Sequence, residues 1–318
     1  MQRAIKAIVK PDPSKPDRLV AIDWSGRIDT SGQRRHIWCA IATRDKPLSL
    51  EAGRTREEIT HFLLSLARET PRMAVSIDCC FSFPAWFLDE HGCEDMFAFW
   101  RKANAGLAEQ WLSREASAIA HDTRFWGAPH KRPAEFSGEG YRRMFRFADY
   151  DNKIAQALAG GDPERAAKMR GITPKSPFQI GGSGSVGTGS LRAMSMLEHL
   201  HAAGFRIWPL EASAINNKRP QPLLVEMYTR LMTGPVAKSN AEARAAYLKL
   251  RRKTDPLYAT IPRPVLTKAT GSEDAFDALV SVIEMQRHAA SFTRLRATRI
   301  PELRKEGLTW RPGLNDTR

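Results

Sequence analysis

The residues of this sequence that could do chemistry are acids placed at the ends of apolar segments. Asp23 follows LVAI, Asp78 follows MAVSI and Glu226 follows LLV, while Asp274 and Asp277 open an apolar segment with helical spacing. A lone carboxylate buried in this way costs on the order of several kcal/mol unless it is hydrogen-bonded, paired or bound to a cation. Several such acids, scattered along the chain, indicate that a single counter-ion neutralises them together. We expect a divalent metal, Mg2+ or Mn2+, which binds carboxylate oxygens, water and substrate phosphate.

Each acid also has an interpretation that needs no chemistry. Asp23 precedes Trp24-Ser25-Gly26, so its carboxylate could accept the amides of a turn. Glu226 could point outward from a half-buried strand. Asp274 and Asp277 fall on one polar stripe that could face solvent, and the helix dipole favours acids in a first turn. The combination favours a metal, because helix acids at i and i+3 can face the cation that strand acids reach from the sheet.

The elements that must position these acids follow from the apolar pattern. RLVAID, RRHIWCAIAT and KPLSLEAG predict three strands of an antiparallel meander. Thr55 and Glu58 form a capping box that begins a helix. The run MAVSIDCCFSFP predicts a strand that is covered on both faces and is therefore central in the sheet.

After an interruption, the second half of the chain adds further predicted helices and strands. Aromatic residues and arginines are frequent in residues 85–175, and the absence of a strand signal predicts a largely helical insertion. A helix with Ser190 as its N-cap and Gly204 as its stop follows, then the strands FRIWPLE and LLVEMYTRL. A last long helix begins at the cap Ser272. The order predicts an α/β fold with a mixed sheet and helices on both faces.

We divide the chain accordingly. The predicted parts are a flexible basic arm (1–17), the first part of the core (18–84), the insertion (85–175), the second part of the core (176–299) and a C-terminal tail (300–318).

Composition indicates an anionic partner. The 318 residues contain 49 Lys and Arg against 35 Asp and Glu, a net charge of +14, which predicts salt-sensitive attraction to polyanions such as nucleic acid. A compositional bias spread over solvated helices would give the same count. The four cysteines form no CxxC pair, and no apolar stretch approaches the roughly 20 residues of a membrane span. We expect a cytoplasmic protein without membrane association.

The segments AIDWSG, SIDCCFSFP, VEMYTR and SEDAFDAL, between about residues 18 and 290, together resemble a family. It is an uncharacterised family of predicted nucleases with a ribonuclease H-like fold, domain of unknown function 429. The resemblance implies a mixed five-stranded sheet, with Asp23, Asp78, Asp274 and Asp277 as metal ligands and Glu226 as an accessory acid. The sequence departs from the family pattern where Thr229 replaces a proline and where the proline after Asp78 comes late.

The resemblance also implies metal-assisted hydrolysis of a phosphodiester, with Asp23 bridging two metal ions. Other side chains would then hold the substrate. The candidate phosphate contacts are Lys175, Arg192, Arg142, Arg143 and Arg146, and the candidate stacking residues are Trp126 and Tyr141. An exposed helical face would explain the arginine cluster equally simply.

A glycine-rich segment, GGSGSVGTGS at residues 181–190, precedes the helix with Ser190. Its amides could hold an anion, or it could be a linker. It lacks the Gly-Lys-Ser/Thr of a P-loop, so we do not expect that class. It contains GxGxxG but follows a segment with two prolines that is a poor strand, so we do not expect a dinucleotide site either. Two other functions stay open: a catalytically inactive nucleic-acid-binding module, and a nucleotide-phosphate-binding protein like sugar kinases and actin-like ATPases.

Overall fold

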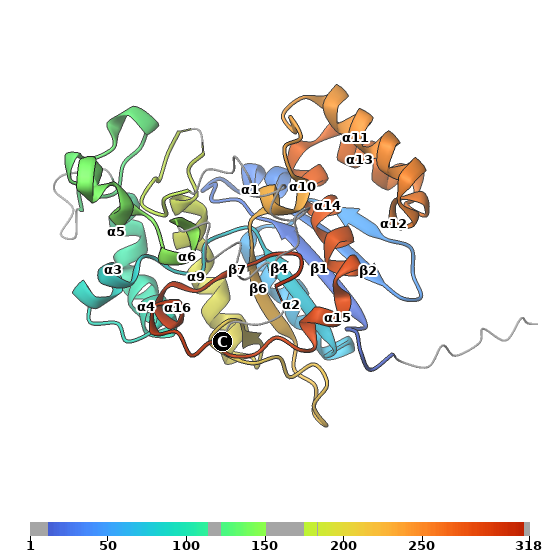
Figure 1. The fold of residues 1–318 in the computed structure, drawn as a ribbon, viewed down its shortest axis with the longest axis horizontal. Helices are drawn as coiled ribbons and strands as arrows, with labels where there is room; N and C mark the ends of the chain where they lie inside the picture. The colour runs from blue at the N-terminus through green and yellow to red at the C-terminus, as the bar shows by residue number, and fades with distance from the viewer. Residues whose placement is uncertain (1–11, 114–121, 151–174, 183, 315–318) are drawn as a thin grey trace, which may run out of the picture.

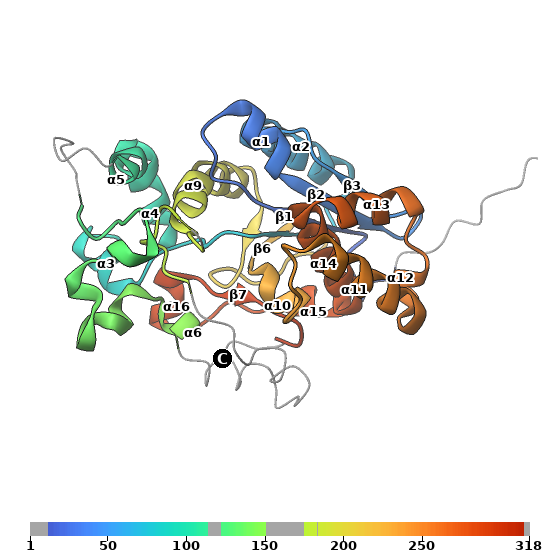
Figure 2. The ribbon, with the colours of Figure 1, turned by 90° about the horizontal axis from the view of Figure 1, so that it is seen from above.

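A mixed sheet of seven strands, with helices on both faces, organises the chain (Figures 1 and 2). The structure is a computed structural model that describes residues 12–113, 122–150, 175–182 and 184–314. Six strands follow the order β3-β2-β1-β4-β6-β5, and β7 also pairs with β6. The strands are β1 (Arg18–Asp23), β2 (Trp38–Thr43), β3 (Ser49–Glu51), β4 (Met73–Ile77), β5 (Arg206–Ile207), β6 (Leu223–Met227) and β7 (Thr309–Trp310).

The strand directions confirm the predicted meander and the mixed sheet. β1, β2 and β3 pair antiparallel, whereas β1 with β4 and β4 with β6 pair in parallel. The carboxyl ends of β1, β4 and β6 therefore lie at one edge of the sheet. The expected count of five strands is wrong. β5 and β7 have two residues each, too few for alternation to be visible in the sequence.

Helices cover the two faces of the sheet with separate apolar cores. One core contains residues of β1 and β4 together with α2 and α9, and the other contains α14 against the opposite side of β1, β4 and β6. Figure 2 shows α2 and α14 on different sides. The helices around the sheet are α1 (Thr30–His36), α2 (Arg56–Glu69), α9 (Gly187–Ala202), α10 (Thr229–Thr233), α11 (Ala241–Thr254), α12 (Pro256–Ala259), α13 (Arg263–Gly271), α14 (Glu273–Arg287), α15 (Ala289–Phe292) and α16 (Pro301–Glu306).

Capping residues fix where several helices begin. Thr55 and Glu58 form the predicted capping box of α2, and the Ser272 hydroxyl accepts from the Ala275 amide as the predicted N-cap of α14. The predicted cap at Ser190 is wrong, because α9 begins three residues earlier. The Ser190 hydroxyl instead donates to the Val186 carbonyl at 2.9 Å, inside the first turn.

The described part of the insertion consists of short helices around an aromatic core. Phe178 lies 5.0 Å from Phe87 and 5.3 Å from Phe83, measured between ring centroids. The aromatic richness of this region therefore builds a core. The elements are α3 (Ala85–Glu90), α4 (Met96–Lys102), the π-helix η1 (Ala103–Leu107), α5 (Ala108–Leu112), the 3-10 helices η2 (Pro129–Lys131), η3 (Ala134–Phe136) and η4 (Gly138–Met144), and α6 (Phe147–Tyr150). Residues 114–121 and 151–174, also assigned to the insertion, lie outside the described residues.

The C-terminal segment is part of the fold, and our expectation of a tail is wrong for its described residues. α16 and β7 lie between residues 301 and 310, and Leu303, Leu308 and Trp310 are buried. Apolar residues separated by prolines and charges gave no continuous pattern in this segment. Its burial comes from contacts with β6 and the insertion.

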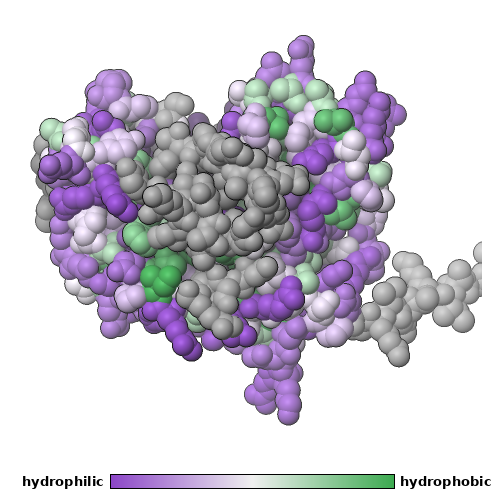
Figure 3. Space-filling view, in the orientation of Figure 1, coloured by the Kyte–Doolittle hydropathy of each residue, from purple (hydrophilic) through white to green (hydrophobic). Residues whose placement is uncertain are grey.

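The surface seen in Figure 3 is mostly hydrophilic over the helices at the rim of this face. None of the helices formed by the described residues combines the length and hydrophobicity that a bilayer span requires.

Replacing the cap of α14 should weaken the whole fold, because this helix packs across β1 and β2. We expect Ser272→Ala to lower the free energy of unfolding by about 1 kcal/mol, measured by urea denaturation. Ser272→Asn keeps a capping oxygen and should retain most of the stability. Equal losses in the two variants would contradict the capping role.

Candidate active site

Asp23 and Asp78 lie side by side at the carboxyl edge of the sheet. β1 and β4 are parallel, and the Asp78 amide donates to the Ile22 carbonyl at 3.0 Å. Side chains alternate along a strand, so Asp78 lies on the same face as Ser76, whose hydroxyl contacts the Met285 sulfur of α14 at 3.0 Å. The parallel pairing thus directs both acids toward the face that α14 covers.

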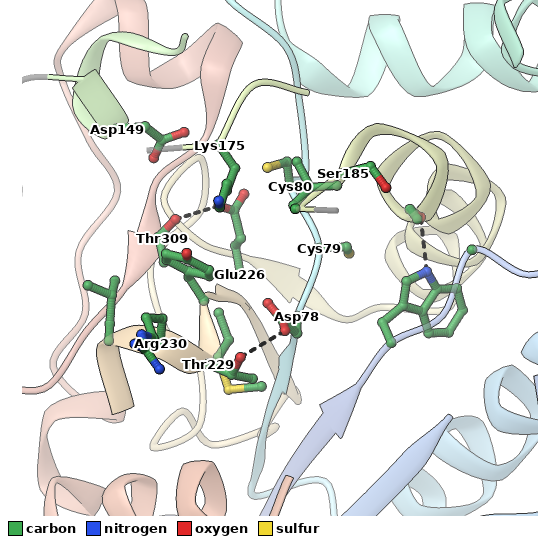
Figure 4. A pocket seen from close by; sticks show the side chains of 18 of the residues that line it. Asp78, Cys79, Cys80, Asp149, Lys175, Ser185, Glu226, Thr229, Arg230 and Thr309 are labelled. Carbon is green, nitrogen blue, oxygen red and sulfur yellow. Dashed lines mark hydrogen bonds between the residues drawn. The ribbon is translucent and has the colours of Figure 1, made fainter. Parts of the chain in front are cut away.

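The first turns of α14 bring Asp277 and Asp274 to the same place. Asp277 is only 2% exposed. The Thr229 hydroxyl, at the start of α10, donates to the Asp78 carboxylate at 3.1 Å (Figure 4) and also bonds Asp277. Asp274 lies at the rim, where its carboxylate is 2.8 Å from the His36 imidazole. Asp277 belongs to the polar stripe of this helix, but its side chain is buried and does not face solvent.

The electrostatics show that these acids share one site. Burial raises the pKa of Asp23 well above its usual value, and the charges of Asp277, Asp78 and Asp274 raise it further. Burial raises the pKa of Asp78 to about 7, with Asp277 adding to the effect. The pKa of Asp277 is also raised by burial, against the lowering effect of Lys238. We call Asp23, Asp78, Asp274 and Asp277 the acid cluster.

Lys238 supplies the positive charge of this cluster. Its ammonium donates to the Asp277 carboxylate and lies 3.6 Å from that of Glu273. Burial opposes its charge, but Asp277, Asp78 and Asp23 keep its pKa above the usual value. No pattern in the sequence indicates this role, because Lys238 lies between α10 and α11 in a segment without periodicity.

The donor chemistry of the cluster fits a divalent cation. Carboxylate oxygens are the ligands that Mg2+ and Mn2+ prefer. The buried Oδ1 of Asp277 has no hydrogen-bond partner among the described residues. Nevertheless, no set of three or more His, Cys, Asp and Glu side chains in the described ranges is arranged to hold a metal ion. The cluster as it stands is closed by Lys238, so a metal would have to compete with this lysine.

Glu226 does not belong to the acid cluster, and its expected role as an accessory acid there is corrected. Its register partner on β4 is Ile77, so Glu226 faces the core opposite to Asp78. The carboxylate is 2% exposed and accepts from the Phe81 amide at 2.7 Å and the Arg146 guanidinium at 2.7 Å. Successive side chains of a strand point to opposite faces of the sheet, and the position of Glu226 on β6 directs its side chain to the face opposite to that of Asp78.

The predicted substrate contacts divide into two groups. Lys175 and Arg146 line a cavity beside the acid cluster. Arg146 is nevertheless occupied, because it pairs with Glu226 and Asp149. Arg192 bonds the Gly26 carbonyl at 2.6 Å and is a structural contact.

The second group does not line this cavity. Arg143 lies 4.5 Å from the Trp86 ring, and Tyr141 packs against Phe145 at 5.4 Å. Trp126 is 5% exposed, so its ring is unavailable for stacking with a base. Arg142 is exposed away from the cavity. Only the stacking role expected of Trp126 is contradicted, because packing of the insertion, which the local sequence does not specify, buries its ring.

The cavity has a volume of about 690 Å3 and extends from the acid cluster toward the insertion and β7. Figure 4 shows Asp78 and Thr229 at one part of its wall and Lys175, Asp149 and Thr309 at another. The residues after β1 close one side: the Trp24 indole donates to the Gly189 carbonyl at 2.9 Å. A Cβ on Gly26 would lie 2.6 Å from the Gly189 amide nitrogen, so this close approach requires glycine.

The raised pKa values predict how stability depends on pH. Between about pH 4 and about pH 7 the folded protein holds a proton on Asp78 that the unfolded chain has released, and the raised pKa values of Asp23 and Asp277 act in the same direction. The free energy of unfolding should therefore fall as pH rises through this range, by up to about 1.4 kcal/mol per pH unit for each acid.

Urea denaturation at a series of pH values checks this dependence. Asp78→Asn removes one titrating group and should make the decline shallower, whereas the exposed Asp45→Asn should keep the wild-type slope. A wild-type slope in Asp78→Asn would contradict the assignment.

Breaking the buried ion pair on the opposite face should be costly. Arg146→Met leaves the Glu226 carboxylate buried without its charge partner, and we expect a loss of roughly 3–5 kcal/mol in the free energy of unfolding. The exposed Arg143→Met should cost less than about 1 kcal/mol. Thermal or urea denaturation compares the two, and equal effects would show that the pair has no special role.

Comparison with known proteins does not place this chain in a family. No family model, no curated protein and no solved structure matches the chain. The function therefore has to be argued from the chemistry of the acid cluster and its cavity.

Proposed function

We propose that the protein is a divalent-metal-dependent hydrolase of phosphodiester bonds that acts on nucleic acid, with the acid cluster as its active centre. One observation carries the proposal. Asp23, Asp78 and Asp277 come from three different elements, the charge of Asp277 raises the pKa of both Asp23 and Asp78, and Asp78 lines the cavity. Grouped acids with shifted pKa values in a cavity are typical of functional sites.

The placement of the acids supports a ribonuclease H-like interpretation. Asp23 ends β1, Asp78 follows β4, and Asp274 with Asp277 open the late helix α14. These are the positions that the resemblance to the predicted-nuclease family assigns to metal ligands. The strand order, with β1 between antiparallel β2 and parallel β4, is compatible with that family's fold.

A bound metal ion would be held by Asp23, Asp78 and Asp277, and it would polarise the phosphoryl oxygen and make a water molecule more acidic. The chain's own residues prepare the site for this. Thr229 fixes the orientation of the Asp78 carboxylate by donating to it at 3.1 Å. Lys238 bonds Asp277 and also lines the cavity, so its ammonium, once a metal ion replaces it on Asp277, would face a bound phosphate.

The charge of the chain supports an anionic substrate. A net charge of +14 attracts polyanions and accelerates their association at low salt. The acid cluster would repel a phosphate unless a cation neutralises it. Hydrolysis should therefore depend strictly on the metal.

Hydrolysis assays with short single-stranded DNA and RNA oligonucleotides, with Mg2+ or Mn2+, test this proposal. Asp23→Asn should lower kcat/KM by at least about 100-fold, which corresponds to about 2.7 kcal/mol of lost transition-state stabilisation. The exposed Asp45→Asn serves as the matched control and should keep wild-type activity.

The absence of cleavage of all substrates with either metal would contradict the proposal, as would an active Asp23→Asn. Salt-sensitive oligonucleotide binding without hydrolysis, unchanged in Asp78→Asn, would instead identify a binding module that lacks the chemistry.

A further inference from the structure

Arg311 is a buried cation in the wall of the cavity. The residue is 4% exposed, it lines the cavity, and its Nε has no hydrogen-bond partner among the described residues. No hydrogen bond or ion pair joins its guanidinium to any residue within the described ranges. Burial lowers the pKa of Arg311 to about 10, although the charges of Asp149 and Glu226 act in the opposite direction.

The nearby carboxylates are already used by another arginine. Arg146 bonds Asp149 at 2.6 Å and Glu226 at 2.7 Å, and it also donates to the Glu306 carbonyl at 2.9 Å. Arg311 therefore has no carboxylate of its own. A guanidinium carries five N–H donors, and the buried Nε–H of Arg311 is left unpaired, which is unfavourable. A ligand with acceptor oxygens and negative charge would satisfy the donors of this guanidinium.

Lys175 adds a second cation to the same cavity. Its side chain lies across Gly184: a Cβ there would be 2.9 Å from the Lys175 ammonium. The glycine thus allows the lysine to lie against the glycine-rich segment. Among the described residues, no hydrogen bond or ion pair engages this ammonium. In Figure 4, Lys175 lies near Thr309 and apart from Asp78 and Thr229.

We propose that Arg311 and Lys175 form an anion subsite that binds a phosphate group of the substrate, away from the phosphate that is cleaved at the acid cluster. Guanidinium is well suited to this task, because its donor pairs match the oxygens of phosphate. The identification of the ligand as part of the substrate rests on the proposed function, whereas the binding of phosphate at Arg311 does not.

The subsite defines the class of substrate. A cavity of about 690 Å3 is in the range of small-molecule sites. A ligand that reaches both the acid cluster and Arg311 inside it needs two anionic groups, as a nucleotide with two phosphate groups has.

Calorimetric titration with inorganic phosphate and with pyrophosphate, in EDTA so that no metal contributes, tests the subsite. The wild-type protein should bind at least one of the two probes saturably. Arg311→Met should weaken binding by about tenfold or more, because the variant removes a buried charge partner. Lys175→Met, at a partly exposed position, should weaken it by a smaller factor. Arg299→Met, an exposed arginine of the same C-terminal segment, is the matched control and should bind like wild type.

Stability separates loss of binding from loss of folding. Replacing an unpaired buried arginine with an apolar side chain should not lower the melting temperature in the absence of phosphate. The subsite is supported if the wild-type protein binds a probe saturably and if both Arg311→Met and Lys175→Met bind that probe more weakly. Failure of the wild type to bind either probe, or wild-type affinity in Arg311→Met, overturns it.

The same titration on Asp78→Asn distinguishes the two proposals. This variant should retain phosphate binding at Arg311 while losing hydrolysis. If no hydrolysis is found but phosphate binding depends on Arg311, the proposed function fails and the subsite stands.

Discussion

The ion pair between Lys238 and the buried carboxylates is the interaction on which the rest of this structure depends. Parallel pairing of β1 with β4 places Asp23 beside Asp78, and α14 adds Asp277 from the adjoining layer. Three desolvated carboxylates in one place repel one another strongly. The Lys238 ammonium offsets this repulsion, and its backbone is held in turn by Arg244, which donates to the Lys238 and Thr270 carbonyls.

A second charge network lies on the other face of the same strand. Glu226 of β6 bonds Arg146 from the insertion and Thr309 from β7, so it joins three parts of the chain. Thr229, three residues further along, contacts the acid cluster. The acid cluster therefore lies on one side of the end of β6, and the ion pair of Glu226 with Arg146 lies on the other. Residues of both groups line the cavity, so its wall contains acidic and basic side chains.

The sequence predicted the elements that carry strong local signals. Apolar segments located β1, β2 and β4, and side-chain caps located the starts of α2 and α14. The sequence predicted that Asp23 and Asp78 share one cation because both acids follow apolar strands, and the parallel pairing of β1 with β4 places them at one edge of the sheet.

The remaining features depend on tertiary contacts that leave no local signal. A shift of one residue along a strand moves a side chain to the other face of the sheet. The sequence around Glu226 did not show which face this residue occupies. Lys238 and Arg311 lie in irregular segments, where no periodicity indicates burial. Trp126 was a candidate for base stacking, but its ring is buried in the packing of the insertion.

A crystal structure of the protein soaked in Mn2+, with an anomalous difference map, would show directly whether the acid cluster binds a metal ion. We expect anomalous density among the carboxylates of Asp23, Asp78 and Asp277, with the Lys238 ammonium withdrawn from Asp277. An intact bond between Lys238 and Asp277, with no anomalous density among these carboxylates at millimolar Mn2+, would contradict this expectation.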